Sequence, residues 1–215
     1  MMNILIFGAT GVVGTCVVKK LIATKTVKKI YLITRRQTLF SEEEKVSEVI
    51  IPNISIDKIL DLQIKANHFI CTIGTTIKKA KSKEKFKYID HDLALAFARL
   101  AKQENAQTFH IVSSMGSDPN SFLFYNKVKG EMEESVKKLE INSLYIYRPS
   151  LLLTKRDEFR LGEKLGVYTA GLFKPLVGKK IGSYLGTTPK SLASKIITNL
   201  ATPEQGTQVI DASEI

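Results

Sequence analysis

Apolar and polar positions follow two alternating patterns along the chain. Short apolar runs are typical of buried strands, and the longer stretches between them repeat apolar residues every three or four positions, as amphipathic helices do. Strands are expected over residues 3–7, 29–34, 49–51, 69–73, 108–112, 143–147 and 208–211. Helices are expected over residues 12–23, 55–64, 87–103, 125–139 and 188–200. This alternation predicts an α/β fold, a Rossmann-type doubly wound parallel sheet with helices on both faces.

The stretch after residue 154 breaks this order. It carries several glycines within a mostly apolar sequence, before a last helix whose start is marked by Thr188 and Pro189. We expect a single domain over residues 1–215, with residues 154–200 contributing a small C-terminal cap over the substrate site. A packing surface or a dimer surface explains the same residues equally well.

The first strand leads into Gly8, Gly11 and Gly14, and a helical pattern begins at Val12. This order brings the start of a helix to the carboxyl edge of a sheet. Gly8 allows a turn that other residues avoid, Gly11 lets a phosphate approach the backbone, and Gly14 lets the helix pack closely on the strand. The free amides at the helix start then bind an anion. A glycine turn without a ligand is the alternative.

Composition limits the class of protein. The 215 residues, 44% apolar and 25% charged, are typical of one soluble globular domain. No apolar stretch approaches the roughly 20 residues of a membrane span, and the N-terminus lacks a secretory signal, so we expect a cytoplasmic protein. The two cysteines, Cys16 and Cys71, lack metal-ligand spacing. The histidines, His68, His91 and His110, are equally scattered, and no metal site is expected.

The formal net charge of +11 indicates anionic partners such as nucleic acid, a membrane surface or phosphorylated small molecules. The lysines are scattered, with one denser stretch at residues 78–87, and no nucleic-acid motif or aromatic stacking pattern accompanies them. We interpret most of them as solvated surface charges, with steering of a phosphorylated ligand as the next interpretation. Neither nucleic acid nor a membrane is the expected partner, and a monomer and a homodimer remain open.

Two arginines, Arg35 and Arg36, follow the second predicted strand. In a dinucleotide-binding sheet, the end of this strand meets the adenosine ribose, where an acid would bind a free 2′-hydroxyl and favour NAD. Two arginines would instead hold a 2′-phosphate through charge-assisted hydrogen bonds. The sequence therefore predicts NADP(H), against the alternative of a surface pair in a loop. Gly74, after the fourth strand, would let the cofactor pass close to the backbone.

Tyr125 and Lys129 lie four residues apart on one predicted helix and so share a face. Ser113 and Ser114 end the preceding strand at the same edge of the sheet. Tyrosine has an ordinary pKa of about 10, and a neighbouring ammonium favours the phenolate, so the pair suits proton exchange. A serine hydroxyl can hold a substrate oxygen while a nicotinamide exchanges the hydride. A Tyr-x-x-x-Lys pair is common by chance, and the order of the surrounding motifs favours the catalytic interpretation.

With these motifs in place, the chain resembles the atypical short-chain dehydrogenase/reductases, and within them the small NAD(P)H-binding proteins related to the Tat-interacting protein. The matching segments are FGATGVVG, ITRR, CTIGTTIKKAKSKEKFKYIDHDLALAFARLAK, VSSMGS, FLFYNKVKGEMEESV and YRPSLLL, which span nearly all of residues 3–160. The long segment that begins CTIGTT is the most specific, and the residues beyond 160 match weakly.

The resemblance implies roles for individual residues. The implied cofactor-binding residues are Gly8, Thr10, Gly11, Val12, Val13, Gly14, Arg35, Arg36, Ile73, Gly74, Tyr125, Lys129, Leu152 and Arg160. The implied catalytic residues are Tyr125, Lys129 and either Ser114 or Ser113. Asp90 stands where many relatives of the extended type have asparagine, so the chain departs from any asparagine-based proton relay.

These observations predict an NADP(H)-dependent oxidoreductase of the short-chain type, built as a single NAD(P)-binding Rossmann domain. It would act on a carbonyl or an alcohol of a small molecule that the sequence does not name. The alternative is an NADPH-binding regulatory or sensor protein with little turnover, because the family includes members better known as regulators than as catalysts.

Overall fold

A seven-stranded parallel sheet forms the centre of the computed structural model, which describes residues 1–152 and 186–215. The strands lie in the order β3-β2-β1-β4-β5-β6-β7. Their bounds are β1 (Met2–Phe7), β2 (Val27–Thr34), β3 (Val46–Ile50), β4 (His68–Cys71), β5 (Thr108–Val112), β6 (Ser143–Arg148) and β7 (Gly206–Asp211). The strand order reverses between β1 and β4, and open α/β sheets bind ligands at such a switch point, outside the carboxyl ends of the strands.

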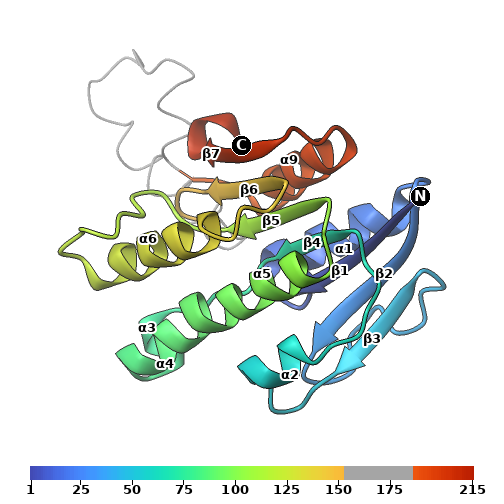
Figure 1. Ribbon diagram of the computed structural model, residues 1–215, viewed down its shortest axis with the longest axis horizontal. Helices are drawn as coiled ribbons and strands as arrows, with labels where there is room; N and C mark the ends of the chain where they lie inside the picture. Colours follow the sequence, from blue (N-terminus) through green and yellow to red (C-terminus); the bar gives the residue numbers. More distant parts are fainter. Residues whose placement is uncertain (153–185) are drawn as a thin grey trace, which may run out of the picture.

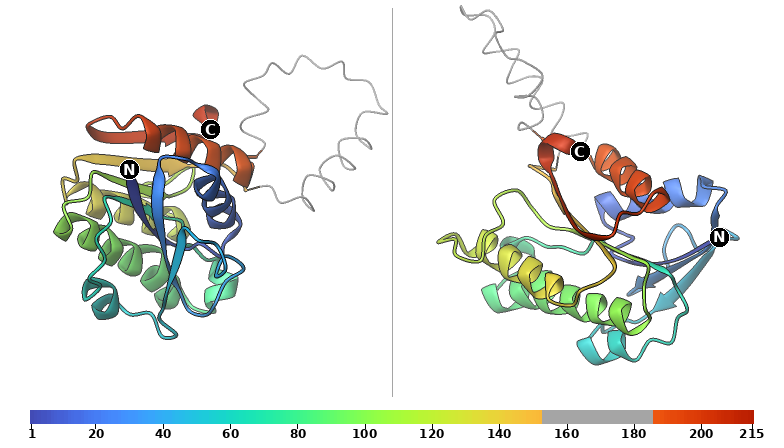
Figure 2. Two further views of the ribbon diagram at one scale, coloured as in Figure 1. Left: turned by 90° about the vertical axis from the view of Figure 1, so that its right-hand side faces the viewer. Right: turned by 45° about the horizontal axis from the view of Figure 1, so that its top comes forward.

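Helices cover both faces of the sheet (Figures 1 and 2). One face carries α1 (Val12–Ala23) and α9 (Pro189–Ala201), which pack against each other. The other face carries α2 (Ile56–Leu60), α5 (Ala94–Gln103) and α6 (Phe124–Lys137). The segment before α5 consists of α3 (Ile77–Ala80), α4 (Lys83–Lys87) and a π-helical turn, η1 (Tyr88–Leu93), and a 3-10 turn, η2 (Ala212–Glu214), follows β7. The predicted doubly wound parallel sheet is confirmed.

The central strand β1 is covered on both sides, which explains its continuous apolar sequence. Leu5 and Phe7 face the α5 side, where the ring of Phe7 meets the ring of Phe97 with centroids 5.7 Å apart. Ile4 and Ile6 point the other way, into the core beneath α1 and α9. This alternation follows the two-residue period of a strand.

Element boundaries depart from the sequence expectation at two informative places. β3 begins at Val46, which pairs with Ile30, three residues before the predicted start at 49. This strand lies at the edge of the sheet and its side chains are mostly half-buried, so its sequence need not be apolar. The helix expected over 87–103 is divided, because the π-helical turn η1 separates α4 from α5.

The range 154–200, expected to cap the site, is also divided. Residues 189–200 belong to α9, because this helix buries Leu192, Ala193, Ile196 and Leu200 in the core that it shares with α1. This part of the range therefore forms a layer of the fold, and the cap over the substrate site stays a prediction. Residues 153–185 lie outside the described residues.

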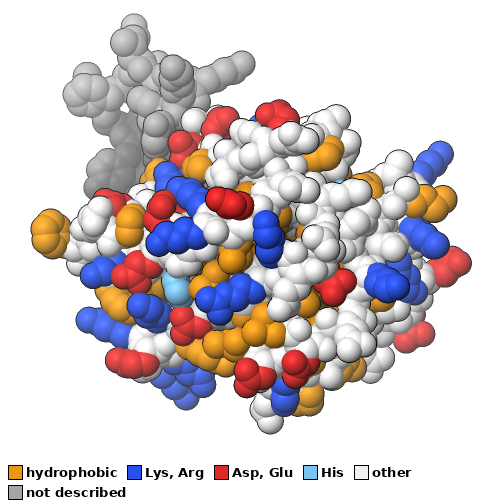
Figure 3. Space-filling view, viewed as in Figure 1, with side chains coloured by type: hydrophobic (Ala, Val, Ile, Leu, Met, Phe, Trp, Pro, Cys, Tyr) orange, Lys and Arg blue, Asp and Glu red, His pale blue; other side chains and the backbone are white. Residues whose placement is uncertain are grey.

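Basic side chains are spread over the surface and are mixed with acidic ones. Figure 3 shows them gathered most densely on the side of α3, α4 and α6. The lysines of the stretch 78–87 are all exposed there, at positions 78, 79, 81, 83, 85 and 87.

Candidate functional site

The glycine turn lies between the end of β1 and the start of α1, at the switch point of the sheet. Gly8 has a φ of 105°, and a Cβ built on it would lie 2.6 Å from the backbone nitrogen of Ile73. A Cβ on Gly14 would lie 2.1 Å from the carbonyl oxygen of Gly8. Thr72 Oγ1 donates to that same oxygen at 3.1 Å, which ties the turn to the end of β4. Only glycine therefore fits at positions 8 and 14.

The first turn of α1 offers its backbone amides without competition from a side chain. Gly11 is the N-cap residue, no side-chain cap is made, and the first turn contains no acidic residue. Thr10, Gly11 and Val12 are exposed at this end, whereas Val13 is buried beneath them. Amides of a helix start that lack a cap, together with the positive end of the helix dipole, favour an anion. The turn thus fits the pyrophosphate of a dinucleotide.

Arg35 and Arg36 follow β2, the neighbour of β1 in the sheet. Both are exposed, and neither has an ion-pair partner among residues 1–152 and 186–215. An arginine without a carboxylate partner keeps all its donors for a ligand, which fits a phosphate at this edge.

Ile73 and Gly74 continue from β4, on the other side of β1. Ile73 is half-buried, and its backbone nitrogen is the atom that a side chain on Gly8 would strike. Gly74 is exposed. The two segments that flank β1, after β2 and after β4, therefore both carry predicted cofactor-binding residues.

Tyr125 and Lys129 lie one turn apart on α6. Tyr125 is half-buried, and its ring packs against Phe86 with centroids 5.4 Å apart. Lys129 is only 4% exposed, and its Nζ lies 2.8 Å from Oδ1 of Asp90, which is 1% exposed. Burial acts to lower the pKa of Lys129, but the Asp90 carboxylate, with a further contribution from Tyr125, raises it above the ordinary value. The lysine therefore holds a positive charge in a buried position.

The two candidate serines have different partners. Ser113 is buried, and its hydroxyl donates to Oε1 of Glu133 at 2.5 Å. Ser117 donates to the carbonyl oxygen of Ser114 at 2.7 Å. Ser114 itself is half-buried, and its Oγ lies 3.3 Å from that of Ser117. A hydroxyl has one proton to donate. The proton of Ser113 is thus held by a carboxylate, whereas that of Ser114 can turn to a ligand.

Glu133 was not among the predicted site residues. It is 1% exposed and forms an ion pair with Arg148, whose Nη2 lies 2.6 Å from Oε2. It lies in the sequence EMEESVKK, where its acidic neighbours made it look like part of a solvated helix face. Its one sequence signal is its position, four residues after Lys129 on the same face of α6.

The loop that carries the serines is held against α6 by a glycine. A Cβ on Gly130 would lie 2.2 Å from the backbone nitrogen of Pro119. Asp118 N also donates to the carbonyl oxygen of Asn126 at 3.1 Å. The loop after β5 and the helix that carries Tyr125 are therefore in direct backbone contact.

The remaining predicted residues lie near the break in the described chain. Leu152 is half-buried, forms an isolated parallel bridge with Thr187, and packs against the core on the α1 side. Arg160 lies outside the described residues.

Two of the three histidines pack within the sheet. His68 and His110 are buried and share a hydrogen-bonded partner, Thr108, at 2.9 and 3.1 Å. Burial lowers the pKa of His68 to about 4 and that of His110 to about 3, so both rings are neutral near pH 7. In the described part of the chain, no three His, Cys, Asp or Glu side chains are grouped so that they could hold a metal ion.

His91, Asp92 and Ser135 have the spacing of a hydrolytic triad. The Nδ1 of His91 lies 2.7 Å from Asp92 Oδ1, and its Nε2 lies 3.2 Å from Ser135 Oγ. The Ser135 hydroxyl, however, donates to the carbonyl oxygen of Glu131 within α6. A mid-helix serine has no free backbone amides beside it to hold an oxyanion, so this group is a structural contact.

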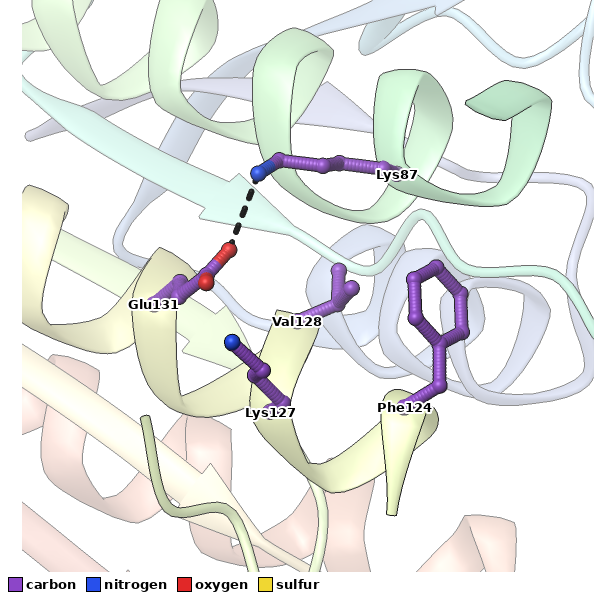
Figure 4. A pocket seen from close by; sticks show the side chains of 5 residues that line it. All are labelled: Lys87, Phe124, Lys127, Val128 and Glu131. Atoms are coloured by element: carbon purple, nitrogen blue, oxygen red, sulfur yellow. Dashed lines mark hydrogen bonds and ion pairs between the residues drawn. The ribbon is translucent and has the colours of Figure 1, made fainter. Parts of the chain in front are cut away.

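A shallow hollow of about 220 Å³ lies between α4 and α6 (Figure 4). Its lining is Lys87, Phe124, Lys127, Val128 and Glu131. Lys87 Nζ and Glu131 Oε2, 3.0 Å apart, join its two sides. Neither Tyr125 nor Lys129 lines it, so the hollow lies beside the candidate site and not within it.

Comparison with known proteins identifies relatives of the whole fold. The HIM1 family model matches residues 18–171. The rat protein HTATIP2 is 33% identical over 165 residues, which cover 76% of this chain and 68% of the relative. FMP52 of Candida albicans is 32% identical over 194 residues, covering 84% of this chain and 85% of the relative. The predicted resemblance to the Tat-interacting-protein type of short-chain dehydrogenase/reductase is confirmed.

The expected cytoplasmic location is contradicted by these relatives. FMP52 proteins from several fungi are named mitochondrial. The expectation was wrong because it rested on composition and on the first residues, and neither distinguishes the cytoplasm from an organelle. Within the described residues, no helix combines the length and apolar character needed to cross a membrane.

Solved structures share the fold at low sequence identity. An oxidoreductase of the short-chain dehydrogenase/reductase family from Burkholderia thailandensis has a TM-score of 0.69 at 15% identity, covering 100% of this chain and 93% of that one. WbmH of Bordetella bronchiseptica, solved with NAD⁺, has a TM-score of 0.69 at 14% identity, covering 96% and 75%. The likeness establishes the Rossmann-like fold of NAD-binding dehydrogenases and epimerases.

Proposed function

Because the chain belongs to the HIM1 family and its glycine turn fits a dinucleotide, we propose that it is an NADP(H)-dependent oxidoreductase of the short-chain type. It interconverts a carbonyl and an alcohol group of a small molecule. The family and the fold support an oxidoreductase of the NAD(P)-binding class, and the site residues support the finer statement.

The buried charge of Lys129 carries this proposal. A chance Tyr-x-x-x-Lys pair would leave its lysine on the surface, where an ammonium is well hydrated. Lys129 is instead 4% exposed and shares a helix face with Tyr125. Removing an ammonium from water is costly unless it is paired, and buried charged groups with shifted pKa values gather at functional sites.

The chain's own residues divide the work of the reaction. The nicotinamide, when bound, supplies or accepts the hydride. Tyr125 gives its phenolic proton to the substrate oxygen during reduction and takes it back during oxidation. Lys129 holds a positive charge beside the phenol and keeps two further donors for a ribose. Ser114 orients the substrate oxygen, because the hydroxyl of Ser113 is bound to Glu133.

The preference for NADP(H) rests on Arg35 and Arg36. Both guanidinium groups lack an ion-pair partner in the described part of the chain and follow the strand next to the glycine turn. A guanidinium group can form two parallel hydrogen bonds with a phosphate, as it does with a carboxylate, so the 2′-phosphate of NADP(H) suits both arginines.

Hydride transfer from NADPH to a panel of aldehydes and ketones tests the proposal. Tyr125→Phe should lower kcat at least about 100-fold, the range for loss of a general acid, while it still binds NADPH. Tyr31→Phe, a half-buried tyrosine on β2, is the matched control and should leave turnover unchanged. Ser114→Ala should lower kcat more than Ser113→Ala does.

Two results would count against this function. Equal turnover by Tyr125→Phe and the wild type would remove the tyrosine from the mechanism. Firm NADPH binding with no turnover on any carbonyl would instead support the second candidate, a regulatory or sensor protein that binds the cofactor. That candidate is favoured by the names of the relatives, HTATIP2 and FMP52, which state no reaction.

A further inference from the structure

Asp90 is a buried carboxylate in an unusual piece of backbone. It lies in the π-helical turn η1, between α4 and α5, whereas its neighbours His91 and Asp92 reach the surface. Isolated π turns inside helices are rare and occur frequently at functional sites. A carboxylate that is 1% exposed needs charged or hydrogen-bonded partners to offset its lost hydration.

The two oxygens of Asp90 bind two different elements. Oδ1 lies 2.8 Å from Nζ of Lys129 on α6. Oδ2 accepts a hydrogen bond from the backbone amide of Thr75 at 2.9 Å. Thr75 follows Gly74, and a Cβ built on Gly74 would lie 3.5 Å from Oδ1. One side chain therefore joins α6 to the loop that continues from β4.

We propose that Asp90 is a positioning residue that holds the Lys129 ammonium and the loop at residues 73–76 in one fixed arrangement. The inference rests on the proposed function, because Lys129 and this loop are the parts that meet the cofactor there. A lysine side chain is long and flexible, and its ammonium is a point charge with no directional fork of its own. Its position must therefore come from a partner, and Asp90 supplies that partner from a third element.

The carboxylate also leaves the ammonium free for its other contacts. Lys129 has three N–H donors, and its ion pair with Oδ1 occupies at most one of them. The other two remain for the phenol side of the site and for a ribose. An asparagine at this position would still accept a hydrogen bond from Thr75 but would not hold the charge of Lys129. Asp90→Asn is therefore the informative substitution, since it keeps the size of the side chain.

The sign of the effect on cofactor affinity distinguishes positioning from charge. Removing a negative charge near the site raises the local positive potential, which on its own strengthens the binding of an anionic dinucleotide. Loss of position does the opposite, because Lys129 no longer meets the ribose. Asp92→Asn is the matched control: it removes the same charge two residues away, where Asp92 pairs with His91.

The experiment measures NADPH affinity by fluorescence titration, which needs no turnover, and kcat and KM for a reduced carbonyl. Asp90→Asn should weaken NADPH binding by about tenfold, because Lys129 loses one charge-assisted hydrogen bond to the ribose. It should also lower kcat by about 100-fold, because the catalytic groups are no longer held in position. Asp92→Asn should bind NADPH as tightly as the wild type or more tightly. Amide hydrogen exchange at Thr75 should stay slow in Asp90→Asn, which keeps that hydrogen bond.

If Asp90→Asn folds poorly on its own, the same substitution can be tested in a protein that also lacks the Lys129 ammonium. Lys129→Met leaves Asp90 buried without its cation and should lower the melting temperature, and adding Asp90→Asn should restore part of it. In this background, Asp90→Asn should cause no further loss of NADPH affinity, because the residue acts through Lys129. A further loss as large as in the wild type would overturn the inference.

The outcomes separate the two proposals. A wild-type protein that binds no dinucleotide overturns the proposed function and this inference with it. A wild type that binds and reduces, with Asp90→Asn indistinguishable from Asp92→Asn, overturns only the inference. Tighter NADPH binding by Asp90→Asn does the same, because charge alone then explains the effect.

Discussion

Gly11, the N-cap residue of α1, and Gly14, in the first turn of that helix, allow phosphate binding to be separated from folding. Gly11 has φ −73° and ψ 166°, a conformation open to alanine, and an added Cβ would lie 3.4 Å from the carbonyl oxygen of Gly8. The same atom on Gly14 would lie 2.1 Å from that oxygen. Contacts of this kind settle at about 3.5 Å, so Gly14→Ala must move α1 by more than about 1 Å, whereas Gly11→Ala moves nothing.

The two substitutions should therefore change the free energy of unfolding by different amounts. Gly11→Ala should change the free energy of unfolding by less than about 1 kcal/mol, because alanine is a poorer N-cap than glycine but restricts the unfolded chain by a comparable amount. Gly14→Ala should cost about 1–3 kcal/mol through overpacking against the turn. The methyl group of Gly11→Ala occupies the space through which a pyrophosphate approaches the amides of α1. NADPH affinity should fall by about tenfold or more, which corresponds to about 1.4 kcal/mol.

Urea denaturation and NADPH fluorescence titration on the same three proteins check both statements. The expected pattern is an unchanged midpoint with weak binding for Gly11→Ala, and a lowered midpoint for Gly14→Ala. If Gly11→Ala bound NADPH like the wild type, the helix start would not be the phosphate site. If Gly14→Ala unfolded at the wild-type urea concentration, the close approach of α1 to the turn would be wrong.

Two further predictions concern the arginines after β2 and the buried histidines of the sheet. Replacing both Arg35 and Arg36 by alanine should weaken NADPH binding by about tenfold or more, because charge-assisted hydrogen bonds to the 2′-phosphate are lost. NADH lacks this phosphate, so its binding should stay unchanged. Equal affinities of the wild type for the two cofactors would refute the role of the arginines. Burial lowers the pKa of His110 to about 3 and that of His68 to about 4, below their unfolded value of about 6.5. Below pH 6.5 the unfolded state binds more protons, so the free energy of unfolding should fall as the pH drops from about 6.5 towards 3, by up to about 1.4 kcal/mol per pH unit for each histidine; a flat profile in urea titrations across that window would contradict the buried neutral rings.

The sequence predicted the order of the elements because that order depends on local patterns. Central strands such as β1 are buried on both faces and show as apolar runs. The same kind of pattern left two interpretations open for residues 189–200, a cap over the site and a packing surface. An amphipathic helix such as α9 has the same pattern whether it closes a site or packs on α1, and only the tertiary contacts of Leu192 and Ile196 decide between them.

The partners of the candidate site were harder to predict because they depend on contacts across elements. Glu133 lies among acidic residues, and nothing local distinguishes it from the exposed face of α6. Its burial follows from Arg148, at the end of β6, fifteen residues along the chain. The π turn at Asp90 was equally hidden, because a single widened turn leaves the apolar spacing of the surrounding helix almost unchanged.

The distribution of paired and unpaired charges connects these features. Lys129 and Arg148, which lie in and beside the site, each have a buried carboxylate as partner, Asp90 and Glu133. These pairs cancel charge within the protein and fix side chains, so they add little to the field outside. The arginines after β2 have no such partner among the described residues, and the uncapped start of α1 follows β1, the strand paired with β2. Under the proposed function, the attraction for phosphate is thus concentrated at Arg35, Arg36 and the start of α1, whereas the charge of Lys129 is neutralised and held in position by Asp90.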